Sequence, residues 1–307
     1  MLFTYGILGL PSWQDFQPFL VTGLSLGGVY ALSGVGMVVL YRATGVLNLA
    51  FGAVGAMGAL IAWSLINHSG WNEWLAYAVC VLFGGVLTLI YGMVFGPALA
   101  KRDPLVKATA TLGLTLILLG VMDLLWTSSG GASRSITLPT DNDTFMVSGI
   151  LVEYTNVIAL ALGLAITVGT SAFLRYTKLG TAMRAMANDR EITATLGVPV
   201  RRVEAAAWFG CGLLSGLAGI LLADLVALDA TTLTFLVLSS LAATIIGQLR
   251  SIPITFIAAL VVGTVDAMIT PINSITNYRD MTPFVLAAAA LLLFNRKRVI
   301  AVGRTGI

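Results

Sequence analysis

Residues 75–100 read LAYAVCVLFGGVLTLIYGMVFGPALA, a continuous apolar run without a charged side chain. About 20 predominantly apolar residues are enough for a helix to cross the hydrocarbon core of a bilayer, so this run predicts a transmembrane helix. Apolar runs separated by short polar breaks continue along the chain and predict an all-α polytopic transmembrane helical bundle of eight or nine spans. We expect spans near 19–40, 45–66, 75–100, 108–126, 155–174, 205–228, 231–248, 252–270 and 281–295.

The composition of the 307-residue chain agrees with this pattern. It is 58% hydrophobic and 10% charged, with a mean hydropathy of +0.94, whereas about a quarter of the residues of a soluble domain are charged. Residues 1–307 are therefore expected to form one membrane domain, with too little loop for a soluble catalytic domain. The break at 247–253 is short, so spans seven and eight either cross fully or form a re-entrant pair.

The placement of basic residues predicts the orientation. Of the 17 Lys and Arg residues, only Arg134 and Arg279 fall in loops of one side, and the other fifteen fall on the opposite side. By the positive-inside rule the N-terminus is outside and the C-terminus cytoplasmic. An outer loop at about 127–154 is large enough for a small cap, and an inner loop at about 175–204 holds six of the basic residues.

Residues for chemistry are scarce. The chain has one histidine, His68, and two cysteines, Cys80 and Cys211, in separate apolar runs, so we expect no catalytic centre and no metal site. No GxxxxGK[ST] pattern is present, so no cofactor is expected on this chain, and ATP would have to be bound by partner subunits. The basic residues do not cluster on a soluble module, which speaks against nucleic-acid binding.

Glycines recur at helical spacing: Gly23 with Gly27, Gly92 with Gly96, and Gly212 with Gly216. Helices in lipid associate through close backbone approach, so these faces predict tight packing within the bundle.

Three carboxylates, Asp123, Asp224 and Asp266, lie a few residues before the expected outer ends of their spans. One hypothesis is an acidic mouth that meets a cationic group of a substrate or a docking protein. The alternative is that they are interfacial residues hydrogen-bonded to neighbouring helix ends. Their depth argues against a proton relay, which needs an ionisable group near the midplane.

The inner loop predicts two short helices. Asn188 as N-cap and Glu191 three residues later match a capping box, and Gly197 followed by Pro199 predicts the stop. The helix, at about 189–196, would carry Ile192 and Leu196 on one face. Such a helix is either a docking element or an amphipathic segment on the lipid headgroups.

This loop resembles the coupling loop of the bacterial branched-chain amino acid ABC transporter permeases. The matching positions are Gly180, Ala182, Arg184, Ala185, Ala187, Asp189, Glu191, Gly197, Arg202 and Val203. Similar residues continue at Gly23–Leu32, Gly45–Ala50, Thr111–Leu114, Gly247 and Ser251. Two departures, Phe51 in place of a common histidine and Gln248-Leu249-Arg250 after Gly247, leave the usual substrate open.

The resemblance implies a permease subunit of a binding-protein-dependent ABC importer in the bacterial inner membrane. Its implied partners are a second homologous permease, two cytoplasmic ATPase subunits and an extracytoplasmic substrate-binding protein. Substrates of the family include branched-chain and other neutral amino acids, urea, short amides and aromatic acids. The ATPases would push on this loop. We expect their contact to include Ile192 and Leu196 as well as the matching residues.

Four polar residues at membrane depth are candidates for the translocation path: Asn48, Thr109, Thr111 and Thr115. Threonine can instead bond its own helix carbonyls, which is the alternative. A different class of function, an ion-coupled secondary transporter, would move substrate without ATPase partners. An intramembrane enzyme is the remaining rival, with His68 as its base.

Overall fold

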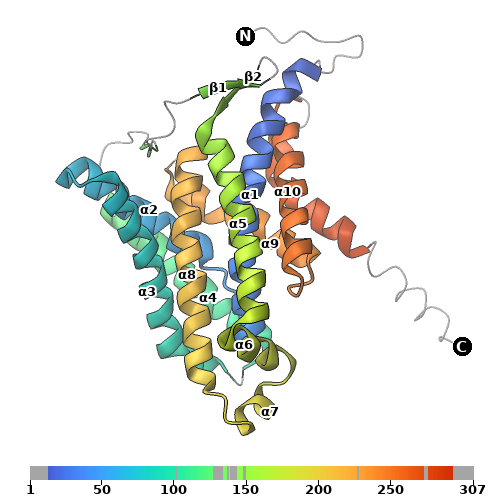
Figure 1. Cartoon of the computed structure of the whole chain (residues 1–307). Helices are drawn as coiled ribbons and strands as arrows, with labels where there is room; N and C mark the ends of the chain where they lie inside the picture. Colours follow the sequence, from blue (N-terminus) through green and yellow to red (C-terminus); the bar gives the residue numbers. More distant parts are fainter. Residues whose placement is uncertain are drawn as a thin grey trace, which may run out of the picture.

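The computed structural model describes residues 13–100, 102–126, 134–136, 138, 144–147, 150–226, 228–272 and 276–292 of the chain (Figure 1). The helices are α1 Trp13–Thr44, α2 Phe51–Ser69, α3 Glu73–Leu99, α4 Pro104–Trp126, α5 Tyr154–Tyr176, α6 Lys178–Asn188, α7 Arg190–Thr195, α8 Val200–Leu225, α9 Ala230–Ile246 and α10 Ile252–Ile269. A short 3₁₀ turn, Thr276–Met281, precedes an apolar helix at Thr282–Leu292. The predicted all-α bundle is confirmed.

Seven of these helices, α1 to α5, α8 and α10, are long and apolar enough to cross a membrane. The expected seventh and ninth spans are shorter apolar helices, α9 with 17 residues and Thr282–Leu292. The one departure from all-α structure in the described residues is a β-hairpin, β1 Thr144–Val147 with β2 Ile150–Glu153, in the loop expected to form a cap. The remainder of that loop lies largely outside the described residues.

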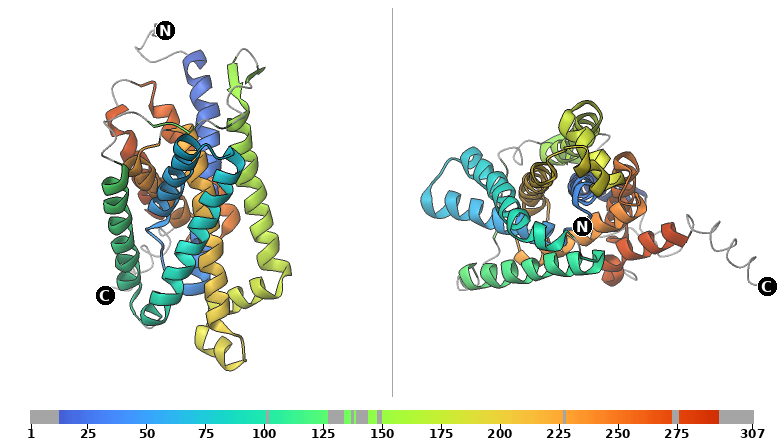
Figure 2. Two further views of the ribbon diagram at one scale, coloured as in Figure 1. Left: turned by 90° about the vertical axis from the view of Figure 1, so that its left-hand side faces the viewer. Right: turned by 90° about the horizontal axis from the view of Figure 1, so that it is seen from below.

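Helix α1 forms the centre of the bundle (Figure 2). It packs against α5, α8, α9 and α10, and nearly all of its apolar side chains from Leu26 to Leu40 are buried. A helix that is apolar on all sides belongs in the interior, because it has no polar face to turn outward.

Close backbone contacts bind the bundle at the predicted glycine faces. A methyl group added at Gly263 of α10 would lie 2.5 Å from the backbone nitrogen of Gly27 on α1. A methyl group added at Gly212 of α8 would lie closer still to the carbonyl oxygen of Gly84 on α3. Gly96, in contrast, faces open space, so the prediction for the Gly92 and Gly96 pair is wrong at Gly96.

The second span was expected to begin near residue 45, but it begins at Phe51. Gly45 has a φ of +67°, which ends α1, and residues 45–50 are not helical before α2 begins at Phe51. Phe51 contacts Ser215, which lies about 22 Å along α8 from its first residue at a rise of about 1.5 Å per residue. The non-helical segment therefore runs to the middle depth of the bundle.

The two ends of the bundle differ in the elements that they carry. The α7 end carries α6 and α7, and the hairpin end, opposite to it in Figure 1, carries β1 and β2.

Candidate functional site

The break between α1 and α2 is held by threonines of α4. The Thr111 hydroxyl accepts a hydrogen bond from the N–H of Leu49 at 3.1 Å and lies 3.0 Å from the carbonyl oxygen of Leu47. The Thr115 hydroxyl lies 3.2 Å from the carbonyl oxygen of Leu49. Backbone groups without a helix to satisfy them are costly at membrane depth, so these side chains supply the missing partners.

Asn48 stabilises the same break from within. Its side-chain oxygen accepts from the N–H of Ala50 at 3.1 Å, and its amide nitrogen lies 3.7 Å from the sulfur of Cys211 on α8. The Ser215 hydroxyl, also on α8, donates to the carbonyl oxygen of Phe51 at 2.5 Å. Asn48, Cys211 and Ser215 are each about 1% exposed, so this is a buried polar cluster.

The N-terminus of α2 ends in this cluster without a cap. Ala50 provides no side-chain hydrogen bond, and within the described part of the chain nothing accepts from the N–H groups of Phe51, Gly52 and Ala53. A small cavity of about 10 Å³, the room of about one water, lies beside it and is lined in part by Ser33 and Ser215. The positive end of a helix at mid-depth is a feature that transporters direct at anionic groups.

Three of the four predicted path residues therefore meet at one place. Asn48, Thr111 and Thr115 surround the break, whereas Thr109 is exposed and donates to the carbonyl oxygens of its own helix. That local bonding is the alternative for threonine, and Thr111 and Thr115 show it as well: their hydroxyls lie 2.8 Å from the carbonyl oxygen of Ala108 and 3.1 Å from that of Thr111, in addition to their contacts with the break. The role of the other three in a path remains a prediction. Ser215 was missed, because its partner Phe51 is 164 residues away in the sequence and no local signal marks it.

At the α7 end, α6 is packed firmly against the spans. Its buried face carries Gly180, Met183 and Met186, and it contacts α1, α5 and α8. Gly180 lies against the backbone of Phe173 and Leu174, so a larger residue there would push α6 away from α5. Arg184 and Ala185 belong to this helix, and the Arg184 side chain is exposed.

Helix α7 is capped by Asp189, not by Asn188 as expected. The Asp189 carboxylate accepts from the N–H groups of Glu191 and Ile192 at 2.9 Å each. Asn188 is still in the last turn of α6, so only Asp189 has the extended backbone that an N-cap needs. Gly197, with a φ of +82°, follows the helix as predicted.

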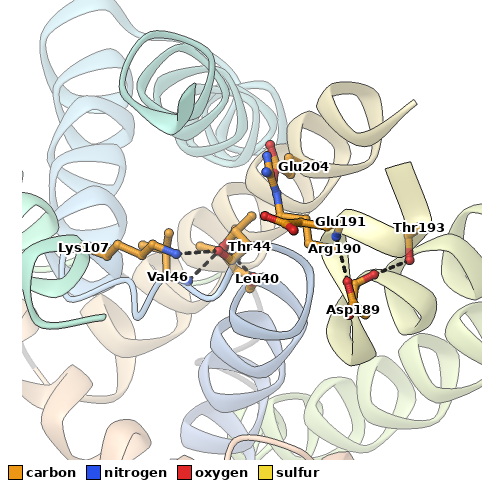
Figure 3. A network of polar contacts seen from close by, with 9 residues as sticks. All are labelled: Leu40, Thr44, Val46, Lys107, Asp189, Arg190, Glu191, Thr193 and Glu204. Carbon is orange, nitrogen blue, oxygen red and sulfur yellow. Dashed lines mark hydrogen bonds and ion pairs between the residues drawn. The ribbon is translucent and has the colours of Figure 1, made fainter. Parts of the chain in front are cut away.

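Two large apolar side chains are exposed on α7 and its C-cap. Ile192 is 59% and Leu196 78% exposed, while Thr193 on the other side is buried and donates to the carbonyl oxygen of Asp189. Arg190 forms an ion pair with Glu204 of α8 at 2.8 Å, which ties α7 to the following span (Figure 3). Arg202, at the start of α8, is exposed. The ridge of Ile192 and Leu196 thus lies on a helix that is capped by Asp189 and ion-paired to α8, and its side chains are exposed in this chain.

The three carboxylates differ in their surroundings. Asp266 is 4% exposed and forms an ion pair with Arg279 at 3.0 Å, and Asp224 accepts from the N–H of Leu138 at 2.9 Å. Asp123 is exposed and lines a cavity of about 370 Å³ with Arg134 and Asp229. Asp224 and Asp266 thus already have partners on neighbouring segments. Within the described residues, no group of three or more His, Cys, Asp or Glu side chains could hold a metal ion.

A family model described as "Branched-chain amino acid transport system / permease component" matches residues 19–292. The probable branched-chain amino acid transport permease protein LivH of Methanocaldococcus jannaschii is 30% identical over 78% of this chain and 76% of its own length. The high-affinity branched-chain amino acid transport system permease protein LivH of Escherichia coli is 25% identical over 91% of this chain and 93% of its own length. The ribose import permease protein RbsC of E. coli is 24% identical over 88% of this chain and 83% of its own length. No solved structure matches the chain.

Proposed function

The chain belongs to the family of branched-chain amino acid transport permease components, and on that basis we propose that it is the membrane subunit of a binding-protein-dependent ABC importer. Its substrates would be branched-chain or other neutral amino acids, or related small polar solutes. ATP would be hydrolysed on partner subunits, not on this chain. The sugar permease among the relatives is the reason to test substrates beyond amino acids.

The α7 ridge carries this proposal. Large apolar side chains exposed on a short, capped and ion-paired helix mark a contact with another protein. Two ATPase subunits are the proposed partners, one on this chain and one on a second homologous permease. The α7 end would then be cytoplasmic, as the basic residues predict, and a substrate-binding protein would dock at the hairpin end.

A continuous set of contacts leads from the ridge to the buried break. α7 packs on α6, α6 packs on α1, and α1 leads directly into residues 45–50. Lys107 of α4 lies 3.5 Å from the carbonyl oxygen of Thr44, the last residue of α1 (Figure 3). A push on α7 would therefore move the end of α1 relative to α4, which holds the break through Thr111 and Thr115.

Purification of the tagged chain from its native membrane tests the assignment. We expect ATPase subunits and a second permease to copurify, and the reconstituted assembly to take up amino acid only with ATP and the binding protein. Glu191→Lys should abolish the substrate stimulation of ATP hydrolysis without removing the chain from the membrane. Uptake by this chain alone, abolished by an uncoupler or by Asp224→Asn, would instead show an ion-coupled transporter.

A further inference from the structure

A large polar cavity opens at the α7 end, away from the exposed ridge. Its volume is about 600 Å³, and it lies between the last turn of α1, the start of α4, the end of α6 and the turn after α9. Four cationic side chains line it, from four different segments: Arg42, Lys107, Arg190 and Arg250. Charges brought together from distant parts of the sequence form a site that no local motif could reveal.

These cations have few partners among the described residues. Arg190 pairs with Glu204 at 2.8 Å, and the Lys107 ammonium reaches only the carbonyl oxygen of Thr44, at 3.5 Å (Figure 3). The guanidinium groups of Arg42 and Arg250 form no hydrogen bond or ion pair within the described part of the chain.

Local charges compensate only part of this excess. Helices α1 and α6 end at the cavity and α4 and α7 begin there, so their partial charges, about half a unit each and of opposite sign, largely cancel. Glu204 offsets one of the four positive charges through its ion pair with Arg190. A net positive charge therefore remains around a space large enough for a ligand.

We propose that this cavity binds a phosphate-bearing anion, the headgroup phosphate of an anionic lipid. Arg42 is in the last turn of α1 and Lys107 in the second turn of α4, so both lie at the ends of spans, where headgroups are found. Basic pockets between transmembrane helices at this level take phosphate headgroups. Tyr41, which also lines the cavity, suits the same interface because its ring is amphipathic. A zwitterionic amino acid, without net charge, would not neutralise the site.

Binding can be measured on the purified full chain in mild detergent. Native mass spectrometry would compare the number of phosphatidylglycerol molecules that the protein retains with the number of added phosphatidylcholine molecules. A thermal shift series would compare the rise in unfolding temperature caused by phosphatidylglycerol with that caused by inorganic phosphate. We expect wild-type protein to retain and be stabilised by phosphatidylglycerol. Arg42→Gln with Lys107→Gln should weaken this by about thirty-fold, since each charge is worth a change of about fivefold to sixfold.

The matched control is Arg175→Gln with Lys178→Gln, which removes two exposed charges at the same end but outside the cavity. It should bind phosphatidylglycerol as wild type does. If the double variant does not fold, Arg250→Gln in an exposed turn provides a second test, and it should also weaken phosphatidylglycerol binding. Stabilisation by inorganic phosphate alone, lost in the same variants, would support the anion site with a free ion as its source. Equal lipid binding by wild type, cavity variants and control would overturn the proposal, as would no effect of either probe.

Discussion

The Thr111 hydroxyl on α4 accepts a hydrogen bond from the backbone N–H of Leu49 at 3.1 Å. This contact joins a regular helix to residues 45–50, a stretch of backbone that leaves the helical pattern near the middle depth of the bundle. It also explains why a polar residue at an entirely buried position of an apolar helix is favourable. The Thr111 hydroxyl gives the N–H of Leu49 the hydrogen-bond partner that a helix would otherwise have supplied.

Thr111→Val tests this contact at almost unchanged side-chain volume. The N–H of Leu49 would lose its acceptor, and leaving a buried donor unsatisfied costs about 1–3 kcal/mol. We expect a lower midpoint of thermal unfolding in detergent. Thr109→Val, on an exposed face of the same helix, is the control and should unfold like wild type. Equal midpoints for both variants would show that Thr111 does not hold the break.

Gly212→Ala tests the contact between α3 and α8. The added methyl group would overlap the Thr88 hydroxyl and the carbonyl oxygen of Gly84, so the helices must separate. We expect a strong loss of folded protein, measured by size-exclusion chromatography after mild solubilisation. Gly210→Ala is the matched control two residues away, because nothing lies within 4 Å of its added methyl group. It should remain monodisperse, or gain slightly in stability from the better helix former.

Asp189→Ala tests the corrected cap of α7. Loss of a capping carboxylate costs about 1 kcal/mol, so amide hydrogens of α7 should exchange about fivefold faster in deuterium-exchange mass spectrometry. Asn188→Ala should leave the exchange unchanged, because the Asn188 side chain caps nothing in the described structure. The reverse result would restore the capping box expected from the sequence.

Leu196→Asp tests the exposed ridge without touching the core. Leu196 is 78% exposed, so the thermal stability of the chain alone should change little. Attachment of the ATPase subunits, measured by copurification, should fall sharply because a charge would be buried in the apolar contact. Ala194→Asp adds the same charge on another face of α7 and should retain the partners. Unchanged copurification of the Leu196 variant would remove the ridge from the ATPase contact.

The ion pair of Asp266 and Arg279 suits a double-mutant cycle. Arg279→Gln would leave a carboxylate that is 4% exposed without its guanidinium, which we expect to cost about 3 kcal/mol. Asp266→Asn in the same chain should recover most of that loss, since the uncompensated charge disappears. The unfolding midpoints of the two single variants and the double variant give the coupling. Additive losses would mean that the pair contributes nothing.

The sequence by itself determined the helical membrane bundle, because a bilayer accepts few structures and long apolar runs identify them directly. It also predicted the two short helices near residues 178–196, since caps and stops are local signals. The shift from Asn188 to Asp189 shows the limit of such signals: either residue could cap, and the end of α6 decided which one did.

Only the tertiary structure decided how distant polar residues combine. Asn48 and Thr111 are far apart in sequence, and the hydroxyl of Thr111 also bonds the carbonyl oxygen of Ala108 in its own helix, so no local signal predicts its contacts with the break. The break at residues 45–50 draws them together because its unpaired backbone groups need partners where no water is available. In the same way, four basic residues far apart in the sequence line one cavity only because the ends of four segments meet there: Arg42, Lys107, Arg190 and Arg250. Composition and period are properties of the chain, whereas such clusters depend on contacts between segments that no local pattern encodes.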